Sequence, residues 1–178
     1  DLFMTDINNA SSIDGALYFW THNTPIQQSG SEYIYTADDY ATYNRTGGTG
    51  TAKGAALSGG QVPSGKIASG QSFFVGTASG IPANSRFQFK NSMRIIDQNT
   101  QFFKQASTKK ATAIEKNRVW LNLTNSGGAF RQLLVGYITG ATNDWDNLYD
   151  GPTFDGQEFV DFYSVNKEKN LTIQGRAL

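Results

Sequence analysis

Short segments of alternating apolar and polar residues, separated by runs rich in Gly, Ser, Asn and Thr, dominate the chain. Alternation with a period of two, together with aromatic and β-branched side chains, predicts half-buried strands. The segment 86–90 turns Phe87 and Phe89 inward. The segment 118–124 places alternate apolar residues on one face and Trp120 on the other. The expected strands are 16–21, 32–36, 71–76, 86–90, 118–124, 130–138, 158–165 and 170–174.

Helical signals are few. Thr36, followed by two aspartates, is expected to cap a short helical turn through Ala41, and residues 1–8 are expected to form another. Residues 46–70 hold many glycines and almost no bulky side chain, so we expect a long surface loop there. The spacing of the strands predicts one all-β domain over 1–178, a β-sandwich of jelly-roll type with long Gly/Ser/Thr-rich loops.

Composition narrows the possible classes of function. No apolar run approaches the length that spans a bilayer, so we expect no membrane insertion. The chain has no cysteine, which excludes disulfides, zinc–thiolate sites and cysteine nucleophiles, and His22 is its one histidine. Hydrolase and nucleotide-binding motifs are absent, because no Gly-x-Ser-x-Gly elbow and no phosphate-binding loop occurs. We therefore expect a protein that is not an enzyme.

Charge is segregated along the chain although the net charge is zero. Residues 1–44 carry six acids and no Lys or Arg, whereas 45–131 carry twelve basic residues and two acids. Residues 132–166 return to six acids and no base. The favoured interpretation is that acidic and basic strands pair across a sheet; the alternative is a basic face for an anionic ligand.

Six ordered strings carry a resemblance that covers nearly the whole chain. They are Asp14–Pro25, Tyr40–Asn44 with Gly47–Gly50, Gly65–Val75, Phe89–Arg94, Arg118–Leu123 and Leu171–Arg176. In this order the strings resemble the β-rich region ahead of the C-terminal sorting domain in surface proteins that Bacteroidetes export by the type IX secretion system. The resemblance implies a secreted, cell-surface location. In these relatives the pattern begins earlier and continues past the position of Leu178, so we expect a fragment of a larger protein.

The acidic segment 142–151 is a candidate metal site. Asp144, Asp146 and Asp150 stand at alternate or near-alternate positions in a turn-rich stretch, and oxygen ligands of this kind suit Ca²⁺. The spacing is not that of an EF-hand. The competing interpretation, which we favour, is that these acids cap a turn or pair with Arg118 or Arg131.

Aromatic side chains are the candidate ligand-binding groups, since flat amphipathic rings can stack on sugars and can equally fill a core. We expect Trp20 and Trp120 to be buried within strands. The candidates for a glycan site are Trp145, Tyr40, Tyr43 and Tyr149, with Lys109 and Lys110 adding attraction for an anionic ligand.

The predicted function is a non-catalytic module of an exported cell-surface protein, acting in adhesion or carbohydrate binding, with a surface or environmental polysaccharide as partner. The alternatives are a passive structural spacer, or a self-associating surface-fibre subunit that presents a secretion sorting domain. In those cases the partner is the rest of a larger chain or a neighbouring subunit. A sequence pI near 6.8 argues against a nucleic-acid partner.

Overall fold

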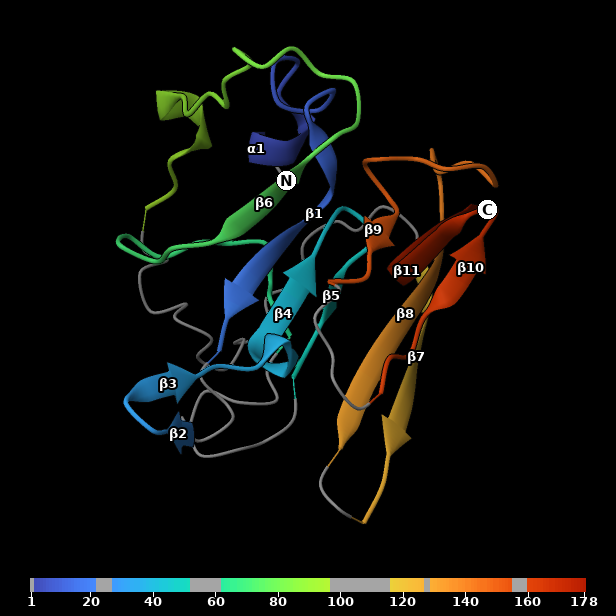
Figure 1. The fold of residues 1–178 in the computed structure, drawn as a ribbon. Helices are drawn as coiled ribbons and strands as arrows, with labels where there is room; N and C mark the ends of the chain where they lie inside the picture. The colour runs from blue at the N-terminus through green and yellow to red at the C-terminus, as the bar shows by residue number, and fades with distance from the viewer. Residues whose placement is uncertain (1, 22–26, 52–61, 97–115, 127–128, 155–159) are drawn as a thin grey trace.

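The computed structural model describes residues 2–21, 27–51, 62–96, 116–126, 129–154 and 160–178. Within these ranges the protein is mostly β-strand with little helix, which confirms the expected all-β class. The strands form two larger sheets and one separate hairpin (Figure 1).

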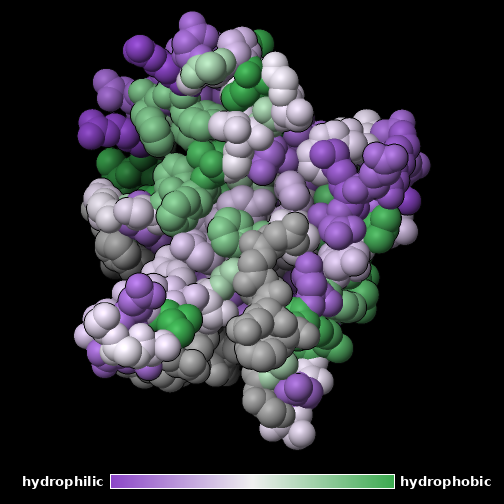
Figure 2. Space-filling view, viewed as in Figure 1, coloured by the Kyte–Doolittle hydropathy of each residue, from purple (hydrophilic) through white to green (hydrophobic). Residues whose placement is uncertain are grey.

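The first sheet is antiparallel and has the strand order β5-β4-β1-β6. Its strands are β1 (Ile13–Trp20), β4 (Tyr40–Tyr43), β5 (Gly48–Thr49) and β6 (Phe74–Thr77). β1 is central and is buried along most of its length. In Figure 2, apolar surface lies over β1 and β6, whereas hydrophilic residues gather around the C-terminus.

The second sheet has the order β10-β11-β8-β7, with β9 paired to β11. Its strands are β7 (Lys116–Thr124), β8 (Phe130–Ile138), β9 (Gly151–Pro152), β10 (Ser164–Asn166) and β11 (Lys169–Ala177). β11 and β8 run parallel, and the other pairs are antiparallel. β5 contacts β8, and β11 contacts β4 and β5, so the β4–β5 hairpin joins the two sheets (Figure 1).

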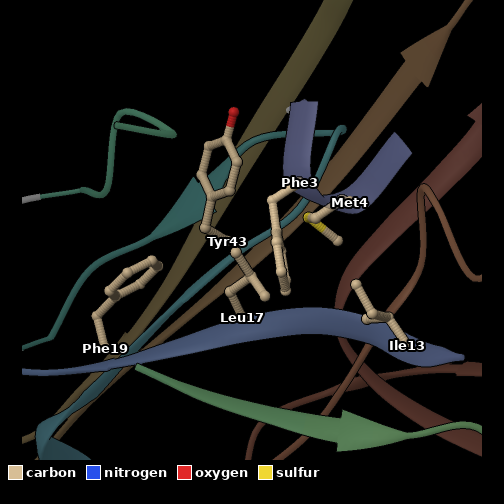
Figure 3. Close-up of a cluster of buried hydrophobic side chains, with 6 residues drawn as sticks. All are labelled: Phe3, Met4, Ile13, Leu17, Phe19 and Tyr43. Carbon is tan, nitrogen blue, oxygen red and sulfur yellow. The ribbon is translucent and has the colours of Figure 1, made fainter. Parts of the chain in front are cut away.

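The main apolar core lies on the outer side of the first sheet, away from the second. Leu17 and Phe19 alternate along β1 and therefore point to the same face, where Tyr43 of β4 joins them. Phe3 and Met4, from helix α1 (Leu2–Thr5), cover this face, and Ile13 completes the cluster (Figure 3). Fully burying each such side chain contributes about 1.5–3 kcal/mol.

Four further short elements complete the fold. β2 (Gln27–Ser29) and β3 (Glu32–Ile34) form the separate hairpin, and η2 (Asn91–Met93) is a single 3₁₀ turn. Another 3₁₀ turn, η1 (Ala37–Asp39), leads into β4. The Thr36 side chain accepts a hydrogen bond from the Asp38 amide at 3.2 Å, which confirms the expected cap.

The segment 46–70 differs at its start from the expected surface loop. Thr46, Thr49 and Thr51 are buried, and β5 lies among them. The cause is the small size of the glycines: a Cβ at Gly47 would stand 2.9 Å from Leu134 Cδ2, so only glycine lets the turn pack this closely on β8. Residues 52–61 lie outside the described part of the chain.

The expected strand over 86–90 is wrong. These residues form no regular element, because the backbone of Gln88 bonds to the buried Asn9 side chain rather than to a neighbouring strand. The Asn9 amide donates to the Gln88 carbonyl at 2.9 Å, and its Oδ1 accepts from the Gln88 amide at 2.8 Å. Phe87 packs against the main core as expected, but Phe89 is 72% exposed.

In β7, alternate apolar residues share one face of the sheet as expected, but Trp120 is not buried as expected. Val119 and Leu121 pair with Val135 and Leu133 of β8, which places them on one side of the sheet. Both are exposed, and Trp120 on the opposite side is 40% exposed although its indole donates to the Gly48 carbonyl at 3.0 Å.

Candidate functional site

A small polar pocket opens between the two sheets, at the beginning of β4 and the end of β5. The opposite side of the pocket is lined by the beginning of β8 and by Thr153, Phe154, Asp161 and Phe162. The groups that carry its chemistry are Asp38, Tyr40, Arg131, Gln132, Phe154 and Asp161, and threonines supply much of the remaining wall. The cavity holds about 30 Å³, room for roughly two water molecules, so a larger ligand would lie across its mouth.

Arg131 is the central charge of the pocket. Its Nη2 lies 2.5 Å from Asp38 Oδ1, an ion-pair contact without the alignment of a hydrogen bond, and its Nε donates to the Val160 carbonyl at 3.3 Å. Burial lowers the pKa of Arg131, and the negative charges of Asp38 and Asp161 act in the opposite direction. The negative charges of two carboxylates therefore compensate the positive charge of one half-buried guanidinium.

The other polar groups are held by hydrogen bonds. Asp161 accepts from the Thr153 hydroxyl at 3.2 Å and from the Phe162 amide at 2.8 Å. Gln132 Oε1 accepts from the Gly50 amide at 2.9 Å, which ties β8 to the end of β5. These bonds fix donors and acceptors on both sides of the pocket.

An aromatic row runs from the pocket wall to the surface. We define it as Tyr35, Trp20, Tyr40, Phe74 and Phe154. Tyr40 is its junction: its ring meets Trp20 edge-on at 5.2 Å and Phe74 edge-on at 5.6 Å, and it tilts against Phe154 at 4.8 Å between centroids. The pairing of Trp20 with Tyr40 places these rings on one face of the sheet. Phe74 is 58% exposed, so the row reaches solvent.

The chain matches a family model over residues 1–178, and that family is described as a domain of unknown function (DUF8693). The chain belongs to this family. No curated protein and no solved structure matches the chain. Within the described residues of the domain, no helix is long and apolar enough to cross a bilayer.

The aromatic residues predicted to bind a ligand do not lie together in the structure. Tyr40 lies in the pocket, but Tyr43 belongs to the main core and Tyr149 to a second buried cluster with Ile138. Both side chains are more than nine-tenths buried, so neither ring offers an open face for stacking. Trp145 is half-buried, and the Lys169 ammonium lies 4.3 Å from its ring centroid. Lys109 and Lys110 lie outside the described residues.

The three aspartates of the acidic segment face different partners. Asp144 is exposed and pairs with Lys167 at 2.7 Å, while Asp146 accepts from the Leu148 amide at 3.0 Å as a turn cap. Asp150 is fully buried and accepts two backbone hydrogen bonds, from Asp146 and from Gly175, both at 2.9 Å. Burial raises the pKa of Asp150 to about 6.

This geometry is that of turn capping, one of the alternatives expected from the sequence, although neither Arg118 nor Arg131 is the partner. Among the described residues, no three carboxylate or histidine side chains are grouped to hold a metal ion. Calcium binding by this segment stays a prediction.

Sequence patterns alone missed most of the pocket. Pairing with the acidic segment is one of the alternatives that the sequence offers for Arg131, but in the structure Arg131 pairs with Asp38, and the charge of Asp161 also acts on it. In the sequence, Asp38 is recognisable only as part of the short helical turn that Thr36 caps. Phe154 follows a two-residue strand, and no periodicity could place its ring against Tyr40.

Proposed function

We propose that the DUF8693 domain is a non-catalytic β-sandwich module of an exported cell-surface protein, which binds glycan for adhesion at the mouth of the polar pocket. The observation that carries the proposal is the position of Tyr40, which belongs both to the pocket wall and to the aromatic row. The resemblance to regions ahead of a type IX sorting domain supports the cell-surface location. The contact between the two sheets through the β4–β5 hairpin supports a sandwich.

The chemistry of the pocket favours a neutral sugar. Sugar rings present apolar C–H faces, which stack on aromatic rings, and hydroxyls, which need donors and acceptors nearby. The aromatic row supplies the rings, and Gln132 and Asp161 supply polar groups. Because Asp38 and Asp161 offset Arg131, the pocket has no excess positive charge to attract an anionic sugar.

Affinity electrophoresis tests this proposal. The chain is run through gels that contain neutral, uronic or sulfated polysaccharides, and we expect a neutral polysaccharide to retard it. Tyr40→Ala should reduce this retardation about 10-fold, since aromatic stacking contributes on the order of 1 kcal/mol or more. Tyr137→Ala is the matched control, because Tyr137 is an exposed tyrosine that lies on β8 outside the pocket.

Equal retardation of the wild type and both variants would place binding elsewhere. Absence of retardation by every neutral polysaccharide would contradict the proposal. Repeating the gels with calcium and with a chelator tests whether the acidic segment contributes an ion.

A second candidate function, self-association as a surface-fibre subunit, is favoured by β7. This nine-residue strand lies at the edge of its sheet among the described strands, and Val119 and Leu121 are 54% and 45% exposed. Long apolar edge strands pair readily with other strands. Sedimentation velocity over a range of concentrations would show a mass that increases with concentration, and Leu121→Lys should abolish the increase.

A further inference from the structure

A second arginine of the same sheet, Arg118 on β7, lacks the carboxylate partners that Arg131 has. Arg118 is half-buried, and its Nε is enclosed without a hydrogen-bond partner. Within the described part of the chain it forms no ion pair with a carboxylate. Burial lowers the pKa of Arg118, and the group that acts against this effect is Tyr43 rather than an acid.

Arg118 lies over the turn that joins β4 to β5. It pairs with Gly136 on β8, and a Cβ at Gly47 would stand 3.5 Å from its Nε and 3.6 Å from its guanidinium carbon. The turn itself is held rigid, because Asn44 accepts from the Thr46 amide at 2.8 Å and donates to the Tyr149 carbonyl at 2.9 Å. The position of the guanidinium is therefore set by packed backbone.

Arg45, in the same turn, supplies a second half-buried guanidinium. Its guanidinium carbon lies 4.8 Å from the centroid of the Tyr149 ring, and its amide donates to the Leu148 carbonyl at 3.3 Å. Both arginines act on the Tyr43 hydroxyl: burial raises the pKa of Tyr43, and the charges of Arg118 and Arg45 lower it. Figure 3 shows this hydroxyl pointing away from Leu17 and Phe19.

A cation that is partly removed from water and has no carboxylate partner favours an anion. A guanidinium loses hydration when it is half-buried, and this loss is normally offset by a carboxylate. Arg118 has no such partner among the described residues, while both arginines keep part of their surface in solvent. The planar donor fork of arginine matches the oxygens of carboxylate and sulfate groups.

We propose that Arg118, with Arg45 of the same turn, forms a subsite for the oxyanion group of an acidic glycan, a sulfate ester or a uronate carboxylate. This subsite rests on the proposed glycan-binding function but lies at the opposite end of the β4–β5 hairpin from the pocket. The pocket, with its offset charge, takes a neutral part of the polymer, and the arginine pair takes its anionic substituent. Tyr149 acts here by positioning Arg45, not as a stacking platform.

Affinity electrophoresis in gels of dextran sulfate, polygalacturonate and uncharged dextran tests the subsite. We expect at least one of the two charged polymers to retard the chain, and the one that does so identifies the oxyanion. Arg118→Gln should weaken this retardation about 10-fold or more, because charge-assisted hydrogen bonds contribute about 1.5–3 kcal/mol. Arg118→Lys, which keeps the charge but loses the fork, should give an intermediate value.

Arg86→Gln is the matched control, since Arg86 is exposed on the irregular segment 86–90 and its loss changes the net charge equally. It should alter the retardation less than about 2-fold, as expected for one exposed charge. Equal effects of Arg86→Gln and Arg118→Gln would show general charge attraction and overturn the proposal. Lack of retardation by both charged polymers would overturn it as well.

Inorganic sulfate provides a test that is independent of any polymer. Sulfate should raise the Tm of the wild type more than that of Arg118→Gln, and the melts show at the same time that each variant is folded. Equal shifts would contradict an oxyanion site at Arg118. Failure of the pocket proposal looks different: Tyr40→Ala would leave retardation by neutral polymers unchanged, while Arg118→Gln would still weaken retardation by the charged one.

Discussion

Arg131 and Arg118 stand on neighbouring strands of one sheet and differ in what surrounds them. Both are half-buried, and burial lowers the pKa of both. Arg131 has Asp38 and Asp161 beside it, whereas Arg118 has the Tyr43 hydroxyl. Along β7 the two positions are separated by five residues, since Arg131 pairs with Leu123, which is about 17 Å. The comparison indicates that Arg131, with carboxylates beside it, stabilises the fold, whereas Arg118, without a carboxylate partner, is available for a ligand.

The largest expected effect is on folding stability when each arginine is replaced by glutamine. Arg131→Gln leaves two carboxylates without their cation and should cost about 3 kcal/mol, at the lower end of the range for breaking a buried pair because Asp38 is partly exposed. Arg118→Gln removes a half-buried charge without a carboxylate partner and should change stability by less than about 0.5 kcal/mol, or raise it. Urea denaturation of both variants measures the difference. Equal losses of stability in the two variants would contradict the proposed difference between the two sites.

Asp150 extends the comparison to a buried charge of the opposite sign. Its pKa is raised from 3.8 to about 6, chiefly by burial, so the native state binds more protons than the unfolded chain between these pH values. The contribution of Asp150 to the free energy of unfolding should therefore fall by on the order of 2 kcal/mol as pH rises from about 4 to 7. The measurement is the pH dependence of urea denaturation for the wild type and for Asp150→Asn. Parallel curves would show that Asp150 does not titrate in this window.

The smallest expected effect concerns one partner of Arg131. Asp38→Asn should lower stability by about 1 kcal/mol, because the carboxylate is 42% exposed and Asp161 remains near the guanidinium. High salt should reduce the difference between this variant and the wild type. A loss as large as that of Arg131→Gln would mean that Asp161 contributes little. The readout is the midpoint of urea denaturation at low and at high salt.

Local pattern predicted most of the strands but not all of them. Alternating side chains predicted β8 at its observed bounds, Phe130–Ile138, and predicted β7 within two residues at its start. The same pattern failed in 86–90, because a distant side chain, Asn9, takes the hydrogen bonds that a strand would need. Periodicity describes which way side chains point, and it does not describe which groups satisfy the backbone.

The candidate site was less predictable than the fold. Tyr40 was expected to bind a ligand and does line the pocket, but the expectation that Tyr43 is an open platform fails, because its ring fills the core. The position of Arg118 depends on a β4–β5 turn that packs on β8. The residues adjacent in sequence to Arg131 do not indicate that carboxylates will lie beside it. Those adjacent to Arg118 do not indicate that it will lack a carboxylate partner.

The amino-acid sequence by itself determined that the chain is built from strands, because period-two alternation and β-branched or aromatic residues act locally. It also determined the cap at Thr36, since a side chain there reaches an amide only two residues away. Only the tertiary structure decided which charges meet. Asp38, Arg131 and Asp161 come from three distant segments, and electrostatic interactions depend on distance in space and on burial, which strand packing creates.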